Sequence, residues 1–248
     1  YIDTILNLLL TLNPTAYDYN RRLYIHTNRT TIRIKEGYKF LDFKKIKDNS
    51  NFFENRPILY IAAGPSLDDN LEWVKKNQNK FFIVCIGRAL KKLVDNEIRV
   101  DVVTTIDEQD FLADTQFDDE TIKNMNKNTI LFASSMTNDN VLNKFDKEKI
   151  YLFEAFLSFF NDNDGFTGFS VGEATLDLLL RFNPKKIYIL GLDLALNQKT
   201  GDTHSSGDKA GSIKINLTED QKDALNKLRD RVKEQLPPKE YLQKDSSL

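Results

Sequence analysis

The sequence predicts an α/β protein of the Rossmann-like class, with a mainly parallel sheet and helices on both faces. Six short runs rich in β-branched and aromatic residues recur along the chain, and most are apolar throughout rather than alternating. Strands of that kind are typical of a sheet that is covered on both sides. Stretches with helical spacing lie between several of the runs, and this alternation favours a doubly wound parallel sheet.

The predicted elements follow one another from about residue 58 to residue 191. The strands are expected at 58–63, 81–86, 100–106, 129–134, 149–154 and 186–191. The helices between them are expected at 67–78, 88–96, 120–126, 138–145 and 169–183. The last of these helices is the clearest, because Val171, Ala174, Leu178 and Phe182 fall on one face at helical spacing.

Changes in the pattern of apolar and polar residues divide the chain into three predicted parts. Residues 1–50 form an N-terminal extension, with a helix over 1–12 and alternation over 30–43 that indicates a β-hairpin. Residues 51–215 form the Rossmann-like domain. Residues 216–248 form a C-terminal helical arm, which is amphipathic and strongly charged.

Composition excludes several classes of function. The 248 residues are 40% hydrophobic and 29% charged, and 35 basic against 37 acidic residues give a formal charge of −2. The net charge is therefore too small to indicate a nucleic-acid or anionic-lipid partner. No apolar run reaches the about 18 residues that a membrane span requires. The single cysteine, Cys85, excludes an internal disulfide and a cysteine-based zinc site, and it suits a cytoplasmic location.

The corner Gly64-Pro65-Ser66 follows the first predicted strand and is the first candidate site. Ligands of an open parallel sheet bind beyond the carboxyl ends of its strands. Gly64 allows close approach of the backbone, and Ser66 can cap the next helix, whose first amides suit a phosphate. The corner is neither a G-x-G-x-x-G motif nor a P-loop, so a tight turn without a ligand is the alternative interpretation.

Other strand ends carry glycine, arginine or acidic residues. Gly87 and Arg88 follow the second strand, Asp107 follows the third, and Asp193 follows the sixth. An acid in such a position often binds a ribose, a metal ion or a substrate hydroxyl. Capping of the following loop is the structural alternative.

Two further segments carry candidate groups. The stretch "GFTGFSVGEA" at 165–174 has three glycines and two hydroxyl groups before a long helix, which could hold an anion or a sugar or simply allow close packing. His204 lies in a long polar loop after Asp193 and is a candidate acid–base group, although a loop histidine is more often solvated surface. His26, in the N-terminal segment, is assigned no role.

Taken in order, three segments resemble the bacterial motility accessory factor family. They are "IAAGPSLDDNLEWV", "IGRALKKLVDNEIRVDVVTTID" and "GFTGFSVGEATLDLLLRFNPKKIYILGLDLALNQKTGDTHSSG". The resemblance covers about residues 55–210 and is strongest over 165–207. The Gly-Pro-Ser-Leu corner is also similar to that of bacterial sialyltransferases that use a CMP-activated sugar, and an archaeal pterin pyrophosphokinase shares the first two segments.

The resemblance implies a cytoplasmic glycosyltransferase of the bacterial flagellum. The implied reaction moves a nonulosonic acid, such as pseudaminic acid, from a CMP-activated donor to flagellin or another protein acceptor. His204 would be the general base, in a loop over the acceptor, and Asp193, at the far strand end, would be the second catalytic residue. The residues implied to bind the nucleotide or the donor are Gly64, Pro65, Ser66, Gly87, Arg88, Asp107, Thr167, Gly168 and Ser170.

The chain departs from the related sialyltransferases at two places. Ala62-Ala63 stands where they carry a small residue and a ligand-binding Asn before the glycine. Gly165 or Phe166 stands where they carry a basic residue ahead of the serine motif. The contacts to the donor are therefore expected to differ.

Two other functions stay open at this point. Transfer from CMP needs a stabilised leaving phosphate and a base, and no cofactor or metal is expected for it. A pyrophosphokinase would instead need Mg²⁺ between ATP phosphates, held by acids such as Asp107. A nucleotide-sugar-binding module without catalytic activity is the third possibility.

Overall fold

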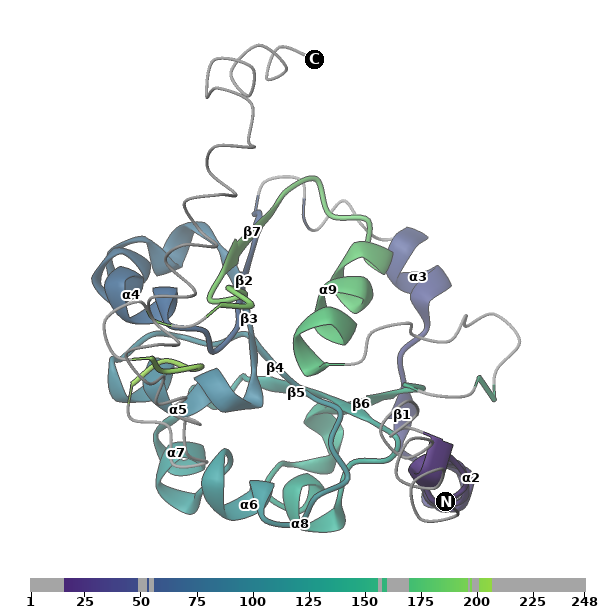
Figure 1. Ribbon diagram of the computed structural model, residues 1–248. Coiled ribbons are helices and arrows are strands. Elements are labelled where there is room, and N and C mark those ends of the chain that lie inside the picture. Colours follow the sequence, from purple (N-terminus) through teal and green to yellow (C-terminus); the bar gives the residue numbers. More distant parts are fainter. Residues whose placement is uncertain are drawn as a thin grey trace, which may run out of the picture.

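The protein is described from a computed structural model (Figure 1), which describes residues 16–48, 53, 56–155, 158–159, 170–195, 197 and 201–206. The seven strands in this part of the chain form one sheet in the order β1-β6-β5-β4-β3-β2-β7. Every pair of neighbours in it is parallel. The predicted fold class is therefore confirmed.

The strands lie close to the predicted ranges. Their bounds are Lys39–Phe40 for β1, Ile58–Ile61 for β2, Phe82–Ile86 for β3, Val102–Thr105 for β4, Ile130–Ser134 for β5, Ile150–Phe153 for β6 and Ile187–Leu190 for β7. Every residue of β2 and β4 is buried, which explains why these runs are apolar or small throughout. β7 lies at the end of the described sheet, and its two middle side chains are exposed.

The five predicted helices are present, and α2, α3 and α6 are additional to them. Their bounds are Ala16–Lys35 for α2, Phe43–Asp48 for α3, Ser66–Asn77 for α4, Gly87–Asp95 for α5, Leu112–Thr115 for α6, Asp119–Asn124 for α7, Asp139–Leu142 for α8 and Val171–Arg181 for α9, with 3₁₀ turns at Gln78–Lys80 and Lys147–Lys149. Figure 1 shows α4, α5 and α7 on one side of the sheet and α9 on the other.

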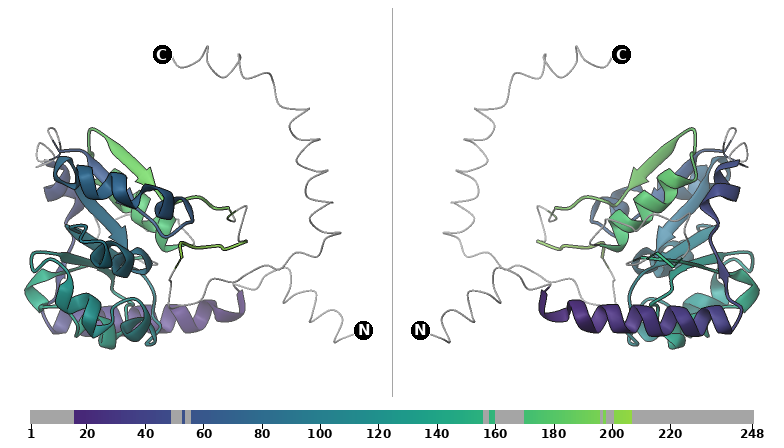
Figure 2. Two further views of the ribbon diagram at one scale, coloured as in Figure 1. Left: turned by 90° about the vertical axis from the view of Figure 1, so that its left-hand side faces the viewer. Right: turned by 90° about the vertical axis from the view of Figure 1, so that its right-hand side faces the viewer.

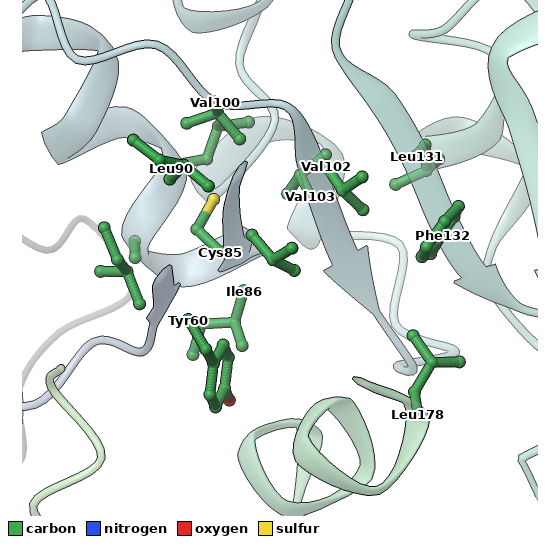
Figure 3. Packing of buried hydrophobic residues seen from close by; sticks show 14 of the residues in the cluster. Tyr60, Cys85, Ile86, Leu90, Val100, Val102, Val103, Leu131, Phe132 and Leu178 are labelled. Carbon is green, nitrogen blue, oxygen red and sulfur yellow. The ribbon is translucent and has the colours of Figure 1, made fainter. Parts of the chain in front are cut away.

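The core lies on both faces of the central strands. Figure 3 shows the side chain of Cys85 directed toward Leu90 of α5, whereas Tyr60 and Ile86 lie on the side of Leu178 of α9. This is the two-residue alternation of a strand whose two faces are both covered. All five side chains are at least 94% buried, with exposed fractions between 0% and 6%.

The predicted β-hairpin over residues 30–43 is wrong. Residues 30–35 are the last turns of α2, and β1 pairs in parallel with β6 instead. Thr30 and Arg33 are both buried, three residues apart on one side of the helix, while Ile32 and Ile34 are partly exposed. The tertiary contacts of this buried side therefore override the β-propensity of the alternating residues.

α2 is held by polar contacts to the segment that follows β5. The Thr30 hydroxyl donates to Ser135 Oγ at 2.7 Å, and the Arg33 guanidinium lies 2.5 Å from a carboxylate oxygen of Asp139. Figure 2 shows α2 as a long helix along one side of the domain. The domain boundaries near residues 50 and 215 stay predictions, and residues 1–12 and 216–248 lie outside the described part of the chain.

Burial makes the single cysteine unreactive. Cys85 is fully buried in β3, and desolvation raises the pKa of its thiol far above the usual value, so the nucleophilic thiolate is absent at neutral pH. We expect no reaction of the native protein with Ellman's reagent and one thiol per chain after unfolding in guanidinium chloride. Rapid labelling of the native protein would show that β3 opens readily.

The part of the chain that the structure describes contains no helix long and apolar enough to cross a membrane.

Candidate functional site

The strand order of the sheet has a topological switch point between β2 and β7. The strands β3 to β6 extend the sheet on one side of β2, and β7 joins it on the other side. In doubly wound folds, ligands bind at such a switch point, beyond the carboxyl ends of the two strands. Here the ends of β2 and β7 are joined by a hydrogen bond of 2.7 Å from the Gly64 amide to the Gly191 carbonyl.

Glycine is required where these two strand ends meet. Gly191 has φ of 74°, and a Cβ atom there would lie 2.3 Å from the Ala62 carbonyl oxygen. A Cβ atom on Gly64 would lie 2.5 Å from both the Gly191 carbonyl oxygen and Asp193 Oδ2. The predicted close approach at Gly64 is therefore made by the chain's own β7 end.

Asp193 lies at the first turn of α4, and the predicted capping of this helix by Ser66 is wrong, because Ser66 is its first residue and its hydroxyl donates to Asp193 instead. Its Oδ2 accepts from the Ser66 amide at 2.7 Å, and its Oδ1 accepts from the Ser66 hydroxyl at 2.5 Å. A carboxylate is favourable at this position because the helix dipole is positive at its N-terminus. The anion next to Ser66 is thus a side chain from the end of β7, and Asp193 holds the Gly64-Pro65-Ser66 corner in place.

The loop that carries His204 lies against the end of β2. The Ser205 amide donates to the Ala63 carbonyl at 2.8 Å, and this places residues 201–206 beside the Gly64 corner. The partly buried His204 has its Nδ1 2.8 Å from the Thr203 hydroxyl oxygen. When Nδ1 carries the proton and donates to Thr203, Nε2 carries the lone pair and is the basic nitrogen of the ring.

The start of α9 lies at the same edge of the sheet. Ser170 caps the helix: its hydroxyl accepts from the Glu173 amide, and the Glu173 carboxylate accepts from the Ser170 amide, both at 3.2 Å. A Cβ atom on Gly172 would lie 2.8 Å from Leu192, directly after β7. Gly64 and Ser170 therefore lie at the same edge of the sheet. The candidates Thr167 and Gly168 lie outside the described residues.

Three other candidates lie farther along the same edge. Gly87 and Arg88 begin α5 after β3, and the exposed Asp107 follows β4. A Cβ atom on Gly87 would lie 2.7 Å from the side chains of Gln116 and Phe117, so packing alone requires glycine there. These residues are one and two strands away from β2, whereas Ser66, Asp193 and His204 gather at the switch point.

Comparison with known protein families shows to which family the chain belongs. The family described as "6-hydroxymethylpterin diphosphokinase MptE-like" matches residues 28–199, which is more than half of the sequence. The chain belongs to this MptE-like family. The resemblance to the pterin pyrophosphokinase, drawn from the segments around Gly64 and Gly87, is thereby confirmed at the level of the family.

A solved structure with a similar fold is the MAf glycosyltransferase from Magnetospirillum magneticum AMB-1. It is 18% identical to the MptE-like chain, with a TM-score of 0.48. The match covers 68% of the present chain and 30% of that protein, so the present chain spans less than a third of it. No curated protein matches the sequence.

Sequence reasoning missed several residues that build the MptE-like site. Asp68 and Lys92 both contact Ser206, and Thr203 contacts His204. The only sequence feature that pointed to Asp68 was its position in the acidic first turn of a predicted helix. The helix dipole favours an acidic side chain there. Its partner Ser206 is 138 residues away, and no local pattern indicates such a contact.

Metal binding is not indicated by the side chains alone. Within the described ranges, no group of three or more His, Cys, Asp and Glu residues is arranged to hold a metal ion. A Mg²⁺ ion that arrives on nucleotide phosphates needs only one or two carboxylates, for which Asp107 stays a candidate. A hollow lined by Ile98, Arg99 and Met125 lies at the opposite edge of the sheet, near the start of β4, and is separate from the switch point.

Proposed function

We propose that this MptE-like protein is a glycosyltransferase that moves a nonulosonic acid from a CMP-activated donor to a protein hydroxyl. Pseudaminic acid is the proposed type of sugar, and Ser or Thr of flagellin is the proposed acceptor. One observation carries the proposal. The loop with His204 is hydrogen-bonded to the Ala63 carbonyl, so a histidine lies in the loop beside the Gly64 corner.

The reaction needs one proton transfer and one displacement. The acceptor oxygen forms a bond to the anomeric carbon of the sugar, and the bond from that carbon to the phosphate oxygen of CMP breaks. CMP leaves with the electron pair, and the acceptor's proton passes to Nε2 of His204. Such assistance requires the base within about 2.6–3.2 Å of the hydroxyl that it deprotonates, or one water away.

The proposed donor pocket lies between the Gly64 corner and the start of α9. Hydrogen-bond donors near the leaving phosphate would stabilise its developing charge without a metal ion. Because Asp193 already accepts from the Ser66 amide, we propose that Arg88 and the Thr167-Gly168 segment supply further contacts to the phosphate. Asp193 would act by holding Ser66 and the corner in position.

A pyrophosphokinase that transfers diphosphate from ATP is the second candidate function. The description of the matched family favours it, and the exposed Asp107 after β4 is the proposed Mg²⁺ ligand. A nucleotide-sugar-binding module without activity is the third. The three candidates differ in which nucleotide binds and whether a metal ion is needed.

Isothermal titration with CMP, ATP and ATP with Mg²⁺ separates these candidates. We expect CMP to bind without a metal ion and more tightly than ATP under all conditions. Binding of ATP that depends on Mg²⁺, together with no binding of CMP, would replace the transferase by the kinase. No binding of any of the three would leave neither enzyme supported.

We expect Ser66→Ala and Ser170→Ala to weaken CMP binding while the fold is kept. Ser170→Ala removes a helix cap, and Ser66→Ala removes the hydroxyl that donates to Asp193, each at a cost of about 1 kcal/mol in the free energy of unfolding. Asp118→Ala is a matched control for Ser170→Ala, because Asp118 caps α7 as Ser170 caps α9 and accepts from the Thr121 amide. CMP affinity measured by titration should fall in the serine variants and stay parental in the control. Parental affinity in all three would place the pocket elsewhere.

A further inference from the structure

Two charged side chains from neighbouring helices fasten the loop that carries His204. Asp68 lies in the first turn of α4, and Lys92 lies in the last turn of α5. Asp68 Oδ2 accepts from the Ser206 amide at 2.8 Å, and the Lys92 ammonium donates to the Ser206 hydroxyl at 3.1 Å. Asp68 and Lys92 also form an ion pair with each other. The three residues therefore make a closed network.

The ion pair joins the first turn of α4 to the last turn of α5. An acid is favoured at a helix N-terminus and a base at a helix C-terminus, and Asp68 and Lys92 occupy these two positions. The Lys92 side chain is 14% exposed and the Asp68 side chain 30%, so water screens the pair less than it screens a fully exposed one. The loop thus contacts a charged pair that is favoured by the dipoles of both helices.

The attachment acts directly next to His204. Ser206 is bound by Asp68 and Lys92, and Ser205 is bound by the Ala63 carbonyl. Two consecutive residues after His204 are therefore fixed to α4, α5 and the end of β2. Since the backbone is held at 205 and 206, the imidazole at 204 can occupy only a narrow range of positions.

We propose that Asp68 and Lys92 form a latch that positions His204 for proton transfer. Both are positioning residues: they touch the loop backbone and Ser206, and they act through His204. The inference rests on the proposed function for the chemical role of His204. The latch itself is a structural property that is tested without any substrate.

Hydrogen exchange tests the latch. Asp68→Ala and Lys92→Met each remove one side of the network. Asp69→Ala and Lys91→Met are the matched controls, since Asp69 is exposed and Lys91 pairs with Asp95 instead. We expect exchange of the Ser205 and Ser206 amides to become about tenfold faster or more in the two latch variants, because loss of the contacts to Ser206 raises the open population of the loop. Parental exchange rates in a variant that is folded by circular dichroism would overturn the latch.

The histidine signals give a second readout that needs no activity. The chain has two histidines, and His26 is buried in α2, so its ring resonances serve as an internal reference. In ¹H–¹³C spectra, we expect the His204 resonances to shift in both latch variants while those of His26 stay in place. Unchanged His204 resonances would show that the latch does not position the ring.

Transfer kinetics connect the latch to the reaction. We expect kcat to fall on the order of 10–10²-fold in the latch variants with CMP affinity unchanged, because misplacement of a catalytic group by about 1 Å has such effects. Asp68→Asn keeps an oxygen for the Ser206 amide and should recover part of the loss. Faster loop exchange with parental kcat would overturn the positioning role. If the parent protein itself shows no transfer, the proposed function fails, while exchange and the histidine signals still decide on the latch.

Discussion

His204→Ala is expected to lose turnover by about 10²–10⁴-fold, which is the usual contribution of a general base. The imidazole lies in the loop bonded to Ala63, beside the predicted donor pocket, and its Nδ1 is oriented by Thr203. In the proposed reaction, removal of the side chain leaves the acceptor hydroxyl without a proton acceptor. CMP affinity should barely change, because the base acts on the acceptor side. Turnover with both substrates present and titration with CMP measure the two quantities.

Two further variants separate a catalytic histidine from a solvated one. Leu194→Ala is a control on the same edge, since Leu194 is 85% exposed in the loop after β7, and we expect parental turnover from it. Thr203→Val removes the partner of Nδ1, so a smaller loss than that of His204→Ala is expected. Near-parental turnover by His204→Ala would show that His204 is an ordinary loop residue.

Gly191→Ala is expected to reduce the free energy of unfolding by about 2–5 kcal/mol. Left-handed backbone costs a residue with a Cβ atom about 1–2 kcal/mol, and overpacking adds about 1–3 kcal/mol. The overpacking arises because the new Cβ would lie 2.3 Å from the Ala62 carbonyl oxygen, which belongs to the backbone and cannot turn away. Since this contact joins the ends of β2 and β7, CMP binding should be lost as well. Denaturant unfolding and CMP titration measure both effects.

Gly37→Ala is the matched control for this prediction. Gly37 has φ of 71°, close to that of Gly191, but a Cβ atom there would meet nothing within 4 Å. Only the backbone term of about 1–2 kcal/mol is therefore expected, with CMP binding intact. An equal decrease in the free energy of unfolding in the two variants would contradict the prediction, because it would show that the ends of β2 and β7 accommodate the new Cβ atom without strain.

The candidate site was only partly predictable from the sequence. The strand-end rule identified Gly64, Ser66 and Asp193 as members of one edge, because all carboxyl ends of a parallel sheet lie on the same side. Direct bonding of Asp193 to Ser66 was not predictable, since the two residues are 127 positions apart and meet only because β7 lies next to β2. The same holds for the contact of Asp68 with Ser206.

The sequence by itself determined the elements of the domain. The six strands from β2 to β7 and the helices α4, α5, α7, α8 and α9 follow from the spacing of apolar residues, which is a local property of the chain. Burial on both faces of the sheet was predictable for the same reason, because strands such as Ile58–Ile61 carry apolar residues at every position.

The tertiary structure alone decided how these elements meet. Residues 30–35 have an alternating pattern, yet they are helical because Thr30 and Arg33 find partners after β5. The order of the strands, the pairing of β1 with β6 and the attachment of the His204 loop depend on contacts between residues far apart in the chain. Such contacts are selected by packing and by satisfaction of buried polar groups in the whole fold, and no short stretch of sequence carries that information.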